Sequence, residues 1–439
     1  MHPPTETLVD GPVTSPSPRS ERRHSWVRSS LVLGVFSVVS GCGGTDSTST
    51  VGAVRDTLPD GTPIVRYDAL GTAETVVELA PDLTLGAVDG EGPQVFGDVR
   101  GIEAGPDGEI FVLDAQALEV RVFGPTGEFR RTLSRHGEGP GELGATNGMV
   151  LAADTLFVYD HRKWAILGLA VDDGRELVRY PTPVRSYGFM WQGVRDYEGR
   201  HWKEASHSEA EPVYPPQEGL NEADSRTYMK VYDPSTEASD SVLLGTRTGR
   251  WWAQAFDNGF SSQQIPFSST TLSVVDPAGG FWRASTEAYR IARLDASGDT
   301  TLIIEAAVPP RPVTPADREA VVEAAAARGA EAARVASDIL DFAGSEHPVV
   351  ASIFVAADRL WVMRDMPEGE RTRVDAFDRD GGYRGSIRLP AGASEYLAPR
   401  VRGRHMYVLT QDDLDIAYVL RLPLPEGLSE APTAGSEGP

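Results

Sequence analysis

Three residues able to bind an ion lie beside a glycine-rich segment, residues 137–141. His136 precedes this segment, while Glu142 and Asn147 follow it. A carboxylate and an imidazole brought together there could hold a cation. Glycines at this spacing also simply form turns. We therefore expect no resident cofactor, with a divalent cation as the alternative.

A cationic group stands at residues 160–164, with the sequence Asp-His-Arg-Lys-Trp. Asp160 begins this group, and His161, Arg162 and Lys163 would place positive charge on an otherwise acidic protein. Such a group could receive a carboxylate or sulfate ligand. The alternative is a set of paired surface charges with no ligand.

An aromatic-rich segment begins at Trp251 and Trp252. Aromatic faces beside amides and carboxylates suit the recognition of sugars or peptides. The alternative is that these rings pack as a small core. The polar and aromatic residues that follow are Phe256, Asp257, Asn258, Phe260, Gln263 and Gln264.

A turn-and-strand motif, residues 108–114, ends in an aspartate and recurs along the chain. Where its copies end at one rim, their last residues could bind a polar ligand. An aspartate there could equally cap its own turn. The last residues of the six copies are Asp114, Asp160, Ala205, Ser285, Arg364 and Thr410.

No catalytic set stands out in this sequence. It shows no Ser/His/Asp order typical of a triad, no histidine pair at zinc spacing and no phosphate-binding glycine motif. We therefore assign no catalytic residue, and a non-enzymatic role is favoured while catalysis stays open.

The repeated motif predicts the fold. Its aligned aromatics are separated by 46, 45, 80, 79 and 46 residues, a period near 45 with two long gaps. Such a period is typical of four-stranded units, and six of them arranged radially make a β-propeller. The aligned aromatics are Phe111, Phe157, Trp202, Trp282, Trp361 and Tyr407.

The long gaps predict insertions on one face, at the edge where the second strand of each unit ends. They cover residues 206–226, 246–270 and 308–348. The last is expected to be helical at about 314–343, because Thr314 can cap a helix and Pro315 suits its first position. The fold class is thus all-β, a six-bladed β-propeller with a helical insertion between blades four and five.

The ends of the domain follow from the same pattern. The last unit lacks a fourth strand, so we expect the N-terminal run 75–85 to supply it and hide the sheet edge. The propeller should then span 61–424, and 425–439, rich in Pro, Gly and Glu, should be disordered.

Composition restricts the partners. The chain has 439 residues and a net charge of −23, which argues against binding nucleic acid or an anionic lipid surface. The single cysteine, Cys42, excludes an intramolecular disulfide. We expect a monomer.

Cys42 follows an export signal. Four arginines precede an apolar run, 31–39, that is too short to span a bilayer permanently. Residues 1–41 are therefore predicted to be a signal peptide, Cys42 the site of lipidation, and 42–60 a flexible tether. The protein would then contact a membrane through its lipid anchor only.

The motifs at residues 108–114, 120–129 and 137–142 resemble those of six-bladed propeller lipoproteins related to NHL-repeat proteins, found in Gram-negative bacteria. The resemblance covers nearly all of residues 60–424, and the first unit is its close match. It implies an exported protein that binds something on its loop face. The resemblance, together with Gly43 after the cysteine, implies that the protein is anchored in the outer membrane of the cell envelope.

Together these features predict a lipid-anchored, non-enzymatic binding module for a glycan, peptide or protein partner. The alternative is a metal-assisted hydrolase or lactonase, because six-bladed propellers also host such enzymes.

Overall fold

The structure is a computed structural model, and it describes residues 52–71, 75–88, 90, 92–183, 194–208, 217–256, 259–367 and 370–430. The predicted signal peptide and Cys42 lie outside these residues. So do Asp257, Asn258 and residues 431–439. The prediction of a mostly β protein is confirmed, since strands dominate the described chain.

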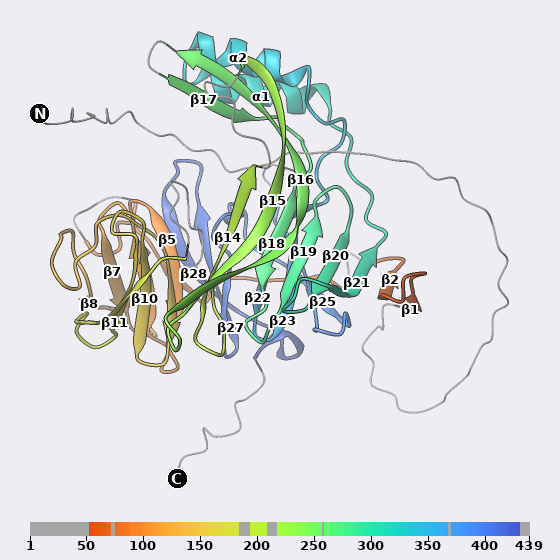
Figure 1. Ribbon diagram of the computed structural model, residues 1–439. Coiled ribbons are helices and arrows are strands. Elements are labelled where there is room, and N and C mark those ends of the chain that lie inside the picture. The colour runs from red at the N-terminus through yellow and green to blue at the C-terminus, as the bar shows by residue number, and fades with distance from the viewer. Residues whose placement is uncertain are drawn as a thin grey trace, which may run out of the picture.

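The described strands form six sheets (Figure 1). The first contains β5 (Val99–Ala104), β6 (Ile110–Asp114), β7 (Glu119–Phe123) and β8 (Phe129–Thr132). The second contains β9 (Thr146–Ala152), β10 (Thr155–Asp160), β11 (Ala165–Ala170) and β12 (Glu176–Pro181). The third contains β13 (Val194–Arg195), β14 (His201–Ser208), β15 (Gly219–Asp233), β16 (Ala238–Phe256) and β17 (Gly259–Gln264).

The other three sheets each add N-terminal strands to a consecutive set. The fourth contains β18 (Thr271–Val275), β19 (Phe281–Ser285), β20 (Arg290–Leu294) and β21 (Thr300–Ala306), extended by β2 (Pro63–Tyr67) and β1 (Ala53–Thr57). The fifth contains β22 (Val350–Ala356), β23 (Arg359–Arg364), β24 (Arg373–Phe377), β25 (Tyr383–Arg388) and β3 (Val77–Glu78). The sixth contains β26 (Arg400–Arg402), β27 (His405–Gln411), β28 (Ala417–Pro423) and β4 (Leu83–Leu85).

Two boundaries differ from the prediction. Strand β1 lies inside the predicted tether 42–60, because it pairs with β2 over its full length. The 3-10 helix η1 (Glu426–Leu428) lies inside the predicted disordered tail, where Leu428 is buried between the fifth and sixth sheets. The N-terminal run does complete the last sheet, since β4 pairs with β28.

The sheets are held together face to face. Each strand alternates its side chains between the two faces, and both faces carry apolar residues. In β6, Phe111 and Leu113 pack toward the second sheet, whereas Ile110 and Val112 pack toward the sixth. Apolar clusters likewise join sheets three and four, four and five, and five and six.

The interface between the second and third sheets is different. Its contacts are aromatic and polar: Tyr180 of β12 packs on Tyr232 of β15 with 5.7 Å between ring centroids. His201 of β14 lies 4.9 Å from the ring of Phe157. Among the described residues, no purely apolar cluster spans these two sheets.

The third sheet extends into an arm. β15 and β16 run beyond the other strands, and β17 lines their far end (Figure 1). Much of the predicted insertions 206–226 and 246–270 is thus strand, because long cross-strand pairing satisfies the backbone there. We call the side of the sheets that carries this arm the upper face.

Two helices cover the end of the arm (Figure 1). They are α1 (Pro315–Ala326) and α2 (Ala330–Leu340), and both lie within residues 314–343. Thr314 and Asp317 form a capping box that starts α1. One face of α2 packs on the arm, where Val335 and Ile339 meet Ile265. No helix among the described residues is long and apolar enough to cross a membrane.

Candidate functional site

The predicted rim aspartates bind the backbone. Asp114 is 1% exposed, and its carboxylate accepts hydrogen bonds from the amides of Gly97, Asp98, Gln116 and Ala117 at 3.0–3.2 Å. These bonds fix both the entry to the first sheet and the turn after β6. Asp114 therefore caps its own turn, which is one of the two roles that the sequence left open.

Asp160 repeats this pattern in the second sheet. It is also 1% exposed, and it accepts hydrogen bonds from Gly144 N at 2.6 Å and Lys163 N at 2.9 Å. Arg364 is engaged as well, because its Nε donates to the buried Asp375 carboxylate at 2.7 Å. None of these three rim side chains is left for a ligand.

The residues of the glycine-rich loop do not converge. His136 is exposed. Glu142 binds Gly139 N and Arg135 Nε, each at 2.8 Å, and these bonds lower the pKa of its carboxyl. Asn147 is buried in β9. Within the described part of the chain, no group of three or more His, Cys, Asp or Glu residues could hold a metal ion.

The cationic group at residues 160–164 divides between surface and interior. Arg162 is exposed and lies 3.8 Å from Glu138. His161 is half-buried, and its Nδ1 is buried with no hydrogen-bond partner. Burial lowers the pKa of His161, although the neighbouring Asp160 carboxylate opposes that shift.

The arm separates the tryptophans and glutamines of the aromatic-rich segment. Trp252 pairs across the strands with Gln263 and packs on Phe342 beside α2, with 5.8 Å between ring centroids. Trp251 pairs with Gln264 on the opposite face of the arm. These four residues therefore lie on two faces of the arm, and Trp252 belongs to a small core, which is one of the two alternatives that the sequence left open.

A polar cavity of about 640 Å³ lies at the base of the arm, and we call it the arm cavity. The base of β16, the strand-linking residues after β17, the upper edge of the fourth sheet and the segment after α2 enclose it. Hydroxyls and charged groups dominate its lining. The lining residues are Thr246, Arg247, Phe267, Ser269, Thr270, Thr271, Ser285, Glu287, Phe342, Ala343, Gly344, Ser345, Glu346 and His347.

His347 is fixed in the wall of the arm cavity. Its Nε2 lies 3.2 Å from Asp317 of α1, and its Nδ1 lies 3.7 Å from Asp365 after β23. Hydrogen bonds from the backbone and hydroxyl of Thr314, together with His347, lower the pKa of Asp317 to about 2. This contact ties the start of α1 to the upper edge of the fifth sheet.

Two backbone features shape the same wall. Phe267 has φ 55°, a left-handed conformation that is unusual for a bulky residue, and its ring lies 4.9 Å from His347. Gly344 donates its amide to Pro266 O at 3.1 Å. A Cβ on Gly344 would lie 2.0 Å from Phe267 O, so only glycine allows this approach.

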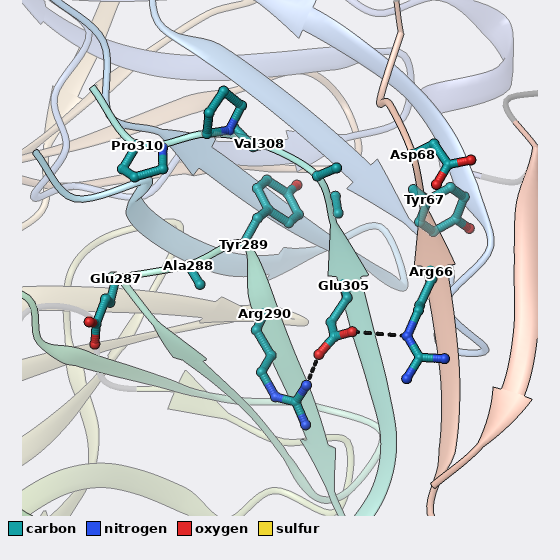
Figure 2. A pocket seen from close by; sticks show the side chains of 13 residues that line it. Arg66, Tyr67, Asp68, Glu287, Ala288, Tyr289, Arg290, Glu305, Val308 and Pro310 are labelled. Carbon is teal, nitrogen blue, oxygen red and sulfur yellow. Dashed lines mark hydrogen bonds and ion pairs between the residues drawn. The ribbon is translucent and has the colours of Figure 1, made fainter. Parts of the chain in front are cut away.

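A second hollow, of about 550 Å³, is shown in Figure 2, and we call it the edge groove. Glu305 of β21 reaches between Arg66 of β2 and Arg290 of β20, and it lies 3.2 Å from Arg66. Its main charged groups therefore neutralise one another. The arm cavity, whose Arg247 makes one long bond of 3.4 Å to Thr270 Oγ1, is the better candidate site.

No family model matches this chain, and no curated protein matches it either. Among solved structures, a Bacteroides fragilis protein is 13% identical, covering 83% of this chain and all of its own, with a TM-score of 0.44. A member of the DUF4221 family from Bacteroides vulgatus is 9% identical, covering 79% and 98%, with a TM-score of 0.43. Virginiamycin B lyase from Staphylococcus aureus is 11% identical, covering 75% and 95%, with a TM-score of 0.36. Likenesses this distant carry no argument about ligand or reaction.

Sequence reasoning missed Arg247, Phe267 and His347. The helix signal at Thr314 placed the insertion that contributes one wall. Nothing in the sequence links His347 to Asp317 and Asp365, because that contact depends on how the helices pack.

We expect Asp114→Ala to lower the free energy of unfolding by roughly 2–4 kcal/mol, because it leaves several buried amides without an acceptor. Denaturant unfolding measures this loss. The exposed Asp413 gives a matched control, since Asp413→Ala should change stability by no more than about 0.5 kcal/mol. Equal effects of the two substitutions would refute the capping role.

His201 should make stability fall in acid. It is 0% exposed, and burial lowers its pKa to about 4. The unfolded chain, with a His pKa near 6.5, binds the proton more readily. Stability is thus complete above about pH 6.5 and is lost as the pH falls toward 4, by roughly 2 kcal/mol between pH 7 and 4.5.

Denaturant unfolding at the two pH values tests this expectation. His201→Gln should lose that part of the pH dependence. His136→Gln, at an exposed histidine, should keep it. A His201→Gln protein with the full acid sensitivity of the unmodified chain would show that another group is responsible.

Proposed function

We propose that this protein is an exported, lipid-anchored six-bladed β-propeller that binds a glycan or peptide segment in the arm cavity. The blade assignment is supported by the six sheets and by the apolar clusters between successive sheets. The sixth sheet packs on the first. Its last strand, β4, comes from the N-terminal side of the chain, as expected for a ring closed by three strands plus one.

The observation that carries the binding role is the arm cavity itself. Its volume lies within the range of about 300–1,000 Å³ that is typical of small-ligand sites. Its walls come from two of the three parts of the chain that interrupt the repeat, 246–270 and 308–348, and from the upper edge of the fourth sheet. A left-handed phenylalanine and a glycine with no room for a Cβ hold these walls in place.

The lining favours a polar ligand with apolar patches. Six hydroxyl side chains can donate and accept hydrogen bonds. The Phe267 ring offers an apolar face to a sugar or a side chain. Arg247 can fix the orientation of a ligand oxygen, because a guanidinium presents several donors in one plane. The hydroxyl residues are Thr246, Ser269, Thr270, Thr271, Ser285 and Ser345.

Export and anchoring rest on the sequence. The apolar run 31–39 followed by Cys42 supports a lipoprotein signal, and Gly43 supports transfer to the outer membrane of a Gram-negative cell. We propose a monomer whose contact with the membrane is the lipid alone. Metal-assisted hydrolysis remains the alternative function, and it predicts a stoichiometric divalent ion in the purified protein.

Arg247→Gln should weaken ligand binding about tenfold or more, because a hydrogen bond from a charged donor is lost. A glycan and peptide array identifies the ligand, and titration calorimetry then measures the affinity of each variant. Arg175→Gln is the matched control, since Arg175 is exposed on the second sheet. An array without a binder, or equal affinity of the Arg247→Gln protein, would overturn the assignment of the arm cavity.

Cys42→Ala should release the protein from membranes, because the anchor needs the thiol for its lipid. Fractionation of expressing cells measures the share of protein in the membrane pellet. Ser47→Ala, within the predicted tether, should leave that share unchanged. A Cys42→Ala protein that still sediments with membranes would refute the anchor.

A further inference from the structure

The contact between the second and third sheets contains buried polar atoms that have no hydrogen-bond partner among the described residues. They are His161 Nδ1 and His201 Nε2. His161 follows β10 at the upper end of the second sheet, where its backbone N donates to Ala145 O at 2.9 Å. Buried polar atoms are usually paired, so unpaired ones in one interface indicate a missing ligand.

A lysine faces the same interface. His201 of β14 points at the second sheet, because Tyr159 OH lies 3.1 Å from its Nδ1. Lys203 is two residues further along β14, so it lies on the same face of the strand and closer to the upper face. Burial is the main cause that lowers the pKa of His161. The positive charges of Lys203 and Arg100 lower it further.

Lys203 occupies a position that is apolar elsewhere in the repeat. Aligned by the repeated aromatics, the same position in the first, second, fifth and sixth sheets holds Val112, Val158, Val362 and Val408, each 0% exposed. In the fourth sheet it holds Arg283, which donates to Leu244 O. The half-buried Lys203 has no hydrogen bond or ion pair among the described residues, and burial lowers its pKa to about 8.

A second lysine stands beside the first. Lys203 of β14 and Lys230 of β15 are directly opposite each other in the sheet. Cross-strand partners share a face, and like charges at such positions repel each other. The sequence contains three lysines in all, so two of them meet here without a described acidic partner. Such an arrangement is stabilised when an anion lies between the charges.

We propose that Lys203, Lys230 and His161 bind an anionic group, a carboxylate or a phosphate, between the second and third sheets. The Asp160 carboxylate does not take the place of this anion, because it accepts hydrogen bonds from backbone amides. This anion site is distinct from the arm cavity, since Trp202 and Glu204 on the other face of β14 turn toward the fourth sheet.

Lysine labelling on the purified full-length protein tests this site. An amine-reactive reagent is applied with inorganic phosphate, with succinate, or with chloride at equal ionic strength, and mass spectrometry measures the modification of each lysine. Phosphate or succinate should reduce labelling of Lys203 and Lys230 several-fold. Lys163 is the internal control, because its Nζ already donates to Glu142 O at 2.7 Å and is not part of the proposed site. The anion that protects identifies the chemistry, and protection by neither overturns the proposal.

Lys203→Val separates ligand binding from a structural role. Without added anion this variant should melt at the same temperature as the unmodified protein or higher, because valine fills this position in four other sheets. It should also lose the rise in melting temperature that the protecting anion produces, whereas Lys203→Arg should keep most of it. A Lys203→Val protein that melts several degrees lower, yet responds to the anion as before, would show a purely structural lysine.

Discussion

The burial of both faces of every sheet is the constraint on which this structure depends. A strand alternates its side chains between two faces, and each sheet lies between two others. Neighbouring positions on one strand must therefore both be apolar, as Ile110 to Leu113 are. A charged residue in such a strand costs stability unless something pairs with it. Departures from the apolar pattern are consequently informative, and Lys203 of the third sheet is one of them.

The repeating part was predictable from the sequence because the same short turn-and-strand motif occurs in each unit. A turn and an aromatic in a short apolar strand recur at a spacing set by four short strands, and two of the copies end in a buried aspartate. The aspartates, however, were ambiguous in the sequence, since a carboxylate at a strand end suits a ligand and a turn equally. Only the hydrogen bonds of Asp114 to four amides distinguish the two.

The interrupting segments were less predictable, for a physical reason. Length alone showed where the repeat is interrupted, and Thr314 with Pro315 showed where a helix begins. Whether the remaining residues form loops or strands depends on pairing between distant segments, such as Gly219 with Ala253. Trp252 likewise became part of a core only because α2 packs on the arm. The arm cavity exists through these long-range contacts, so no short motif marks it.

The third sheet contains two kinds of polar residue: those that have a partner within the fold and those that do not. Glu204 of β14 and Arg283 of β19 also stand at positions that are mostly apolar in the other sheets, but each lies near the opposite charge of the other, so their charges offset each other within the fold. Lys203 replaces an apolar residue in its column and lies opposite Lys230, so two like charges share the other face of these strands without a described acidic partner. A structural role explains a polar group that has found its partner within the fold. A buried charge without a described partner is explained by a molecule outside the fold, and this difference is the reason for placing the anion site between the second and third sheets.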